Sequence, residues 1–138
     1  MSGTTVIKSP AMRRLLVAVC GLALLIISGG FVLISFWIGA DVRTISRVAM
    51  QQYEGDRVEA LLQFVEDANH SLKDRNRAVW ALGQLGDRRA LPVLGKYYTG
   101  EPCDHRTALC QHELGKAIKL VDGGINVTAM IWRHPASK

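Results

Sequence analysis

A run of 26 residues without Asp, Glu, Lys or Arg, from Leu15 to Ala40, constrains this chain of 138 residues more than any other feature. A helix from Leu15 to Ile38 would be about 36 Å long, enough to cross a hydrocarbon core of about 30 Å with some tilt. Buried helices of soluble proteins rarely carry more than about fourteen apolar residues in a row. The run therefore predicts a helix that crosses a membrane once.

A cleavable secretory signal is the main alternative for the same run. The apolar region of a signal peptide spans about 7 to 15 residues, and the uncharged run is much longer. The residues at its end, Ile38-Gly39-Ala40, would nevertheless serve as a cleavage site, so removal of the run stays open. We expect an uncleaved single-pass anchor.

Basic residues on the two sides of the run predict its orientation. The arm over residues 1–14 has three Lys or Arg and no acidic residue, and two Arg follow the run (Lys8, Arg13, Arg14, Arg43, Arg47). Cytoplasmic flanks of membrane helices are enriched in Lys and Arg. We therefore expect a cytoplasmic N-terminus and a main body in the periplasm or another extracytoplasmic compartment.

The distribution of charge argues against a protein that binds nucleic acid. The chain has a net charge of +5, of which the N-terminal arm holds +3. Residues 41–138 hold 14 basic and 12 acidic side chains, a net charge of only +2. A basic arm beside a membrane helix neighbours anionic lipid headgroups. We therefore expect the lipid bilayer, and no nucleic acid, as a partner of the basic residues.

Small residues within the apolar run predict a surface for a second membrane helix. Ser28, Gly29 and Gly30 leave a notch near the middle of the span, and Ser35 and Gly39 form a small-xxx-small pair. Small side chains let two helix backbones approach closely in a membrane. Glycine is also common in membrane helices in general, so packing against a partner and ordinary composition both stay open.

After the run the apolar spacing is helical, most regularly from Arg75 to Leu94. The apolar residues there recur at the i, i+3, i+4 and i+7 positions of one helix face (Ala78, Trp80, Ala81, Leu82, Leu85). Gly86 then ends the helix, Asp87 can cap the next one, and Pro92 lies in the first turns of that helix. The pattern predicts a helix, a tight turn and an antiparallel helix.

This stretch resembles the HEAT-like repeat of the phycobilisome-lyase superfamily. Three segments carry the resemblance, namely Arg77-Ala78 with Trp80-Ala81-Leu82-Gly83, Leu85-Gly86-Asp87, and Ala90-Leu91-Pro92-Val93-Leu94. The resemblance implies stacked helical hairpins of a kind widely used as binding scaffolds. Kinship with the lyases themselves would imply attachment of a chromophore.

Weaker copies of the pattern occur on both sides of it. Apolar positions over 48–62 fall 32 positions before those over 80–94, and Leu109 to Gly115 fall 29 positions after Trp80 to Gly86. Repeats of about 20 to 50 residues indicate solenoids. We expect an all-α fold, in which one transmembrane helix runs on into a HEAT-like α-solenoid of two to three helical hairpins. The expected divisions are a basic arm (1–14), the transmembrane helix (15–40), the repeat domain (41–122) and a C-terminal docking tail (123–138).

Cys103, His105, Cys110 and His112 lie within ten residues and form the one cluster that can carry chemistry. Two Cys and two His suit tetrahedral zinc, but the spacing lacks a CxxC knuckle, and Cys110 and His112 would point about 200° apart on a helix. A disulfide between Cys103 and Cys110 is favoured outside the cytoplasm. Three alternatives stay open, and the sequence favours a disulfide first, free or buried thiols second and a metal site last. We expect no metal or cofactor.

The sequence contains no recognisable catalytic set. His112-Glu113 occurs once, so the paired His-Glu ligands of HEAT-repeat iron hydroxylases cannot be assembled. A nucleophile elbow, a Gly-rich phosphate loop and an HExxH motif are also missing from the sequence. We therefore expect a protein that is not an enzyme.

Two groups of residues are candidates for contacts with a partner. A basic edge can meet an acidic partner or simply pair with Asp74 and Asp87 (Arg75, Arg77, Arg88, Arg89). The apolar tail, which contains Trp132, can dock on the last repeat or on a partner. We expect an interaction protein that is an accessory or assembly subunit of a larger membrane complex. The alternative is a metal- or pigment-handling protein, or a lyase-like enzyme, that uses the Cys/His cluster.

Overall fold

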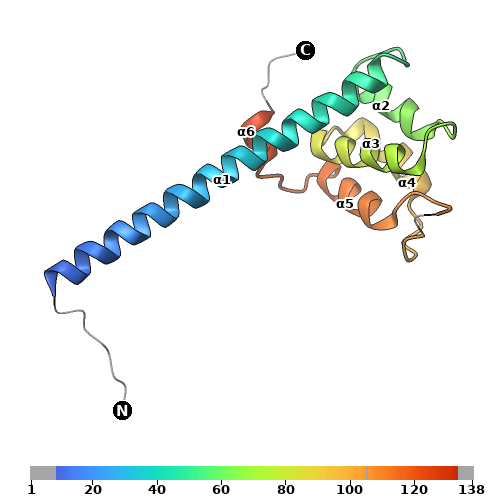
Figure 1. Ribbon diagram of the computed structural model, residues 1–138. Coiled ribbons are helices and arrows are strands. Elements are labelled where there is room, and N and C mark those ends of the chain that lie inside the picture. Colours follow the sequence, from blue (N-terminus) through green and yellow to red (C-terminus); the bar gives the residue numbers. More distant parts are fainter. Residues whose placement is uncertain (1–8, 105, 134–138) are drawn as a thin grey trace.

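The computed structural model of the chain describes residues 9–104 and 106–133 (Figure 1). Within these residues the secondary structure is entirely helical, and the elements are α1 (Pro10–Met50), α2 (Arg57–Glu66), α3 (Leu72–Leu85), the 3-10 helix η1 (Arg88–Ala90), α4 (Leu91–Tyr97), α5 (Gln111–Val121) and α6 (Ala129–Trp132). The predicted all-α fold, a long apolar helix followed by shorter packed helices, is confirmed. Lys8 of the basic arm and His105 of the Cys/His cluster lie outside the described residues.

The first part of α1 contributes no residue to the hydrophobic core of the described chain. From Leu15 to Ile34 its side chains are exposed, apart from the half-buried Gly30, and none of the most apolar 18-residue stretch is buried. By length and composition α1 is a candidate membrane span, and a signal sequence near the N-terminus would share both properties. In Figure 1 this part extends away from the other helices.

The second part of α1 belongs to the packed domain. The helix continues through Gly39 to Met50 without a break, as the sequence predicts. Its buried residues recur every three or four positions and form one stripe (Ser35, Gly39, Val42, Ile45, Ser46, Ala49). This stripe faces α2, α3 and α6. One helix therefore joins the apolar span directly to the core.

Local signals at the helix ends explain where the hairpins turn. Asp56 and Glu59 form a capping box at the start of α2, and the Ser71 hydroxyl accepts the Asp74 N–H at the start of α3. Gly86 ends α3 in the left-handed conformation at φ 65°, which glycine adopts without a steric penalty. Asp87 then caps η1. The predicted helix, turn and second helix over 75–94 are all present.

The core runs through the domain in successive layers. The C-terminal half of α1, then α3, then α5 pack against one another, while α2 and α4 return between them. Leu61, Leu82, Leu94 and Leu114, one from each of α2 to α5, are completely buried. A Cβ atom on Gly83 would lie 2.8 Å from the Ala117 Cα atom, so α3 and α5 are packed almost backbone to backbone.

The C-terminal segment folds back onto the first helix. α6 packs on α1, and the Trp132 side chain is only 6% exposed. The Arg133 guanidinium donates to the carbonyl of Gln84 in the last turn of α3, where helix carbonyls lack intrahelical partners. The tail therefore docks on α1 and on the end of α3, whereas the sequence suggested the last repeat or a partner.

Candidate functional site

The four arginines of the predicted basic edge all have acceptors within the chain. Arg89 has Asp56 at 2.7 Å, Asp87 at 2.9 Å and Glu59 at 3.3 Å. The hydrogen bond with Asp87 is the main reason that the pKa of Arg89 is raised. The hydrogen bond from the Glu59 backbone N–H is the main reason that the pKa of Asp56 is lowered. This network joins the start of α2 to the start of η1.

The other three arginines also hold helices together. Arg77 pairs with Asp41 on α1, and its hydrogen bond with that carboxylate raises the pKa of Arg77. Arg75 donates from Nε to the Val65 carbonyl at 2.8 Å, and Arg88 lies 3.8 Å from Asp122. Arg75 and Arg77 thus connect helices, whereas the Arg88 pair is exposed and long. The availability of these arginines to an acidic partner stays a prediction.

The small residues of α1 divide into two groups. Ser28 donates its hydroxyl to its own helix at Leu24, and a Cβ atom added to Gly29 or Gly30 would meet nothing within 4 Å. Ser35 and Gly39, in contrast, are buried. A Cβ atom on Gly39 would lie 2.7 Å from Cγ of Trp132.

The chain itself therefore occupies one of the two surfaces that were expected to meet another membrane helix. The notch of Ser28, Gly29 and Gly30 is uncovered within the described residues, and partner packing there stays a prediction. Gly39 instead lies against Trp132 of α6, and Ser35, one turn before it, is buried. Trp132, a candidate for docking on a partner, is buried in this intramolecular contact.

The two cysteines predicted to pair are adjacent in space. Their Sγ atoms are 2.7 Å apart, and both residues are free thiols in the structure. Cys103 is partly exposed and accepts the backbone N–H of His112 at 3.2 Å, whereas Cys110 is buried at the start of α5. The Asn76 side chain on α3 accepts the Cys110 N–H at 2.8 Å and positions this end of the loop.

The two thiols have opposite acid–base properties. The contact with the Cys110 thiol lowers the pKa of the Cys103 thiol, and the His112 N–H adds to this effect. Burial raises the pKa of the Cys110 thiol. A partly exposed, more acidic thiol beside a buried one is suited to thiol–disulfide exchange. Over the described ranges, no three His, Cys, Asp or Glu side chains are grouped so that they could hold a metal ion.

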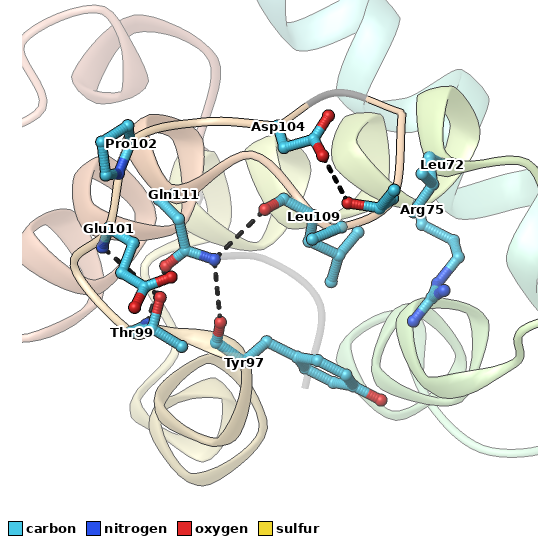
Figure 2. A pocket seen from close by; sticks show the side chains of 11 residues that line it. Leu72, Arg75, Tyr97, Thr99, Glu101, Pro102, Asp104, Leu109 and Gln111 are labelled. Carbon is cyan, nitrogen blue, oxygen red and sulfur yellow. Dashed lines mark hydrogen bonds between the residues drawn. The ribbon is translucent and has the colours of Figure 1, made fainter.

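A cavity of about 460 Å³ lies between the loop before α5 and the helices α3 and α4. The residues that line it come mainly from this loop (Leu72, Arg75, Tyr97, Thr99, Glu101, Pro102, Asp104, Thr107, Ala108, Leu109, Gln111). Figure 2 shows Gln111 between the two arms of the loop. Its Oε1 accepts the Thr99 N–H at 2.7 Å, and its Nε2 donates to the carbonyls of Tyr97 and Leu109. The polar groups of Gln111 thus shape the cavity.

A polar cluster joins the end of α1 to the loop between α2 and α3. The Tyr53 hydroxyl donates to Asp67 Oδ2 at 2.6 Å and lies 2.8 Å from His70 Nε2. The His70 ring stacks on Phe64 with 3.7 Å between centroids. The hydrogen bond to Asp67 raises the pKa of Tyr53 to about 12 and lowers the pKa of Asp67. The sequence did not predict this cluster, because its members lie in separate turns and form no short motif.

The comparisons with known proteins agree with the repeat and add no activity. The family model described as PBS lyase HEAT-like repeat matches residues 74–99, which contain all but the first two residues of α3 together with η1 and α4. No curated protein and no solved structure matches the chain. HEAT-like repeats generally mediate protein–protein interactions, so the matched segment suggests an interaction or scaffold role.

Proposed function

We propose that the protein is a membrane-anchored interaction protein, an accessory or assembly subunit of a larger membrane complex. The observation that supports this most directly is the continuity of α1. Its first part exposes apolar side chains that the described residues leave uncovered, and its second part lies in the core of the helical repeat. Because one helix contains both parts, a bilayer around the first part would hold the repeat domain close to the membrane surface.

The orientation of the protein is part of the same proposal. The N-terminal arm would lie in the cytoplasm and the repeat domain outside it, as the distribution of Lys and Arg favours. In an oxidising compartment, Cys103 and Cys110 would form a disulfide through exchange with an oxidised dithiol protein. That exchange converts the two thiols to a disulfide and reduces the partner's disulfide to two thiols.

Purification of the full-length protein from membranes in a mild detergent tests the proposal. The expected result is that the chain resists extraction by alkaline carbonate, retains its first 40 residues by intact mass, and copurifies with other membrane proteins at a fixed stoichiometry. Cleavage near residue 40 would overturn the anchor. An intact, membrane-bound chain that runs as an isolated monomer would overturn the role as a subunit.

A matched pair of variants sharpens the test. Gly29→Leu fills the uncovered notch of α1 at a position where an added Cβ atom meets nothing within 4 Å outside the helix's own backbone, and Ile27→Leu changes an exposed residue on the opposite face of the same helix. If the notch receives a partner helix, Gly29→Leu reduces copurification and Ile27→Leu does not. Equal recovery of partners with both variants would show that the notch is not the contact.

A further inference from the structure

Three exposed apolar side chains of the C-terminal segment have no evident role in the fold. Ile125 is 84% exposed, Val127 54% and Met130 78%, whereas Ala129 and Trp132 in the same segment are buried. We propose that residues 125–132 form a second membrane contact, which lies in the interface of the bilayer that α1 crosses. This inference rests on the proposed membrane span of α1.

The position of Trp132 along α1 places the segment at the edge of the bilayer. A hydrocarbon core of about 30 Å accommodates about 20 helical residues, so a span centred in the uncharged run ends close to residue 38. Gly39 is the residue of α1 that Trp132 contacts, and a Cβ atom there would lie 2.7 Å from the indole Cγ. The segment is therefore held at the level where hydrocarbon gives way to headgroups.

The surface of α1 at the same level has the character of an interface. Phe36 and Trp37, immediately before Gly39, are 51% and 72% exposed. Aromatic residues are enriched where membrane helices leave the hydrocarbon core. Ile125, Val127 and Met130 would extend this apolar band sideways from α1, close to the exposed apolar residues that precede Ser35 on the same helix.

The neighbouring charges lie on the far side of this band from the span. Asp41, two residues after Gly39, pairs with Arg77, and Arg43 and Arg47 are exposed further along α1. Arg133 turns its guanidinium to the Gln84 carbonyl on α3. In Figure 1, α6 lies nearer than any other helix of the packed domain to the exposed part of α1. The apolar segment thus lies on the side of the domain nearest to the span.

A second contact has a consequence for the orientation of the domain. A single helix that crosses a bilayer leaves the attached domain free to rotate about the helix axis. An interfacial segment on one side of α1 removes that freedom, because rotation would lift its apolar side chains out of the interface or bury them deeper. The same face of the helical repeat would then always point away from the membrane.

Depth-dependent fluorescence quenching tests the proposal with the three native cysteines in place. A fluorescent amino acid is introduced by codon suppression at Met130, at Ile26 in the span, or at Glu54 at the far end of the domain. The full-length protein is placed in nanodiscs of phosphatidylcholine and phosphatidylglycerol that carry a nitroxide either high or low on the acyl chain.

The expected pattern distinguishes the inference from the proposed function. The label at Ile26 should be quenched most by the deep nitroxide. The label at Met130 should be quenched most by the shallow nitroxide, and several-fold more than the label at Glu54. Quenching at Ile26 with none at Met130 would overturn the interfacial contact and leave the span intact, including the case in which a protein covers the segment. Absence of quenching at Ile26 would overturn the anchor itself.

A variant pair separates apolar contact from simple proximity. With the label at Ile125, Met130→Glu should lower shallow quenching to the level at Glu54, because a carboxylate favours water over the interface. Met130→Leu keeps the apolar surface and should keep the quenching. Since Met130 is 78% exposed, neither change should alter the helical circular dichroism of the domain. Equal quenching in both variants would contradict the proposal.

Discussion

The two parts of α1 reverse the usual relation between hydropathy and burial. Residues 15–34 are almost uniformly apolar and yet exposed, whereas the part from Ser35 to Met50 contains charged residues and is buried along one stripe. In a soluble protein the more apolar part would be the buried one. The reversal is expected if the first part has lipid as its solvent, because a uniformly apolar surface is stable in hydrocarbon and unstable in water.

The largest expected effect comes from comparing Gly39, in the buried part of α1, with Gly29, in the exposed part. Gly39→Leu should displace Trp132 and release α6, at a cost of about 3 kcal/mol, since the new side chain occupies the space of the indole ring. Hydrogen exchange of the α6 amides in nanodiscs measures the release. Gly29→Leu is the matched control, because no atom beyond the neighbouring backbone of α1 lies within 4 Å of a Cβ at that position. Similar exchange in both variants would show that Trp132 does not depend on Gly39.

Truncation of one apolar side chain in each part gives the next largest effect. Val42 is completely buried, and Val42→Ala should lower the free energy of unfolding of the repeat domain by about 2 kcal/mol. Leu24 is 65% exposed, so Leu24→Ala should leave that free energy unchanged. Denaturant unfolding in detergent, followed by circular dichroism, measures both. A loss at Leu24 as large as that at Val42 would mean that the first part also packs within the chain.

The fold was largely predictable because its signals are local. The uncharged run, the spacing from Ala78 to Leu85, and the stop at Gly86 each depend on residues within a few turns of one another. The continuation of the long helix through Gly39 was predictable for the same reason. Periodicity and capping act over one or two helical turns, and a single sequence displays both directly.

The contacts of the candidate site were less predictable because they join distant segments. Trp132 and Gly39 are far apart in the sequence, and nothing in either segment indicates that they meet. The basic edge was expected to meet an acidic partner or to pair with Asp74 and Asp87, and no pattern in the sequence indicated that Arg77 pairs with Asp41, which a neighbouring helix brings into reach. The adjacency of Cys103 and Cys110 was predictable only because a short loop joins them.

The Arg77 and Asp41 pair provides a smaller test at the point where the exposed part of α1 meets the domain. Asp41→Asn should cost about 0.5 kcal/mol in low salt and less in high salt, because both side chains are partly exposed and screened by ions. Thermal unfolding at two salt concentrations measures the difference. A double-mutant cycle with Arg77→Gln isolates the pair, and a coupling energy of zero in low salt would contradict the assigned pairing.

The smallest effect concerns the polar cluster of Tyr53, Asp67 and His70 at the end of α1, and it appears at alkaline pH. The hydrogen bond to Asp67 raises the pKa of Tyr53 from 10.0 to about 12, so the folded state holds the phenolic proton more tightly than the unfolded chain does. The contribution to stability is fully present below pH 10 and is lost as the pH rises through about 12.

The absorbance of tyrosinate at 295 nm, taken as the difference between the wild type and Tyr53→Phe, should therefore have a midpoint near pH 12. Asp67→Asn should move that midpoint toward 10, whereas Glu66→Gln should not, because Glu66 pairs with Lys96 instead. A midpoint that is unchanged by Asp67→Asn would mean that the polar cluster does not form. The second part of α1 would then be held by apolar packing and by the Asp41–Arg77 pair, and the contrast with the first part would rest mainly on Val42 and its neighbours in the buried stripe.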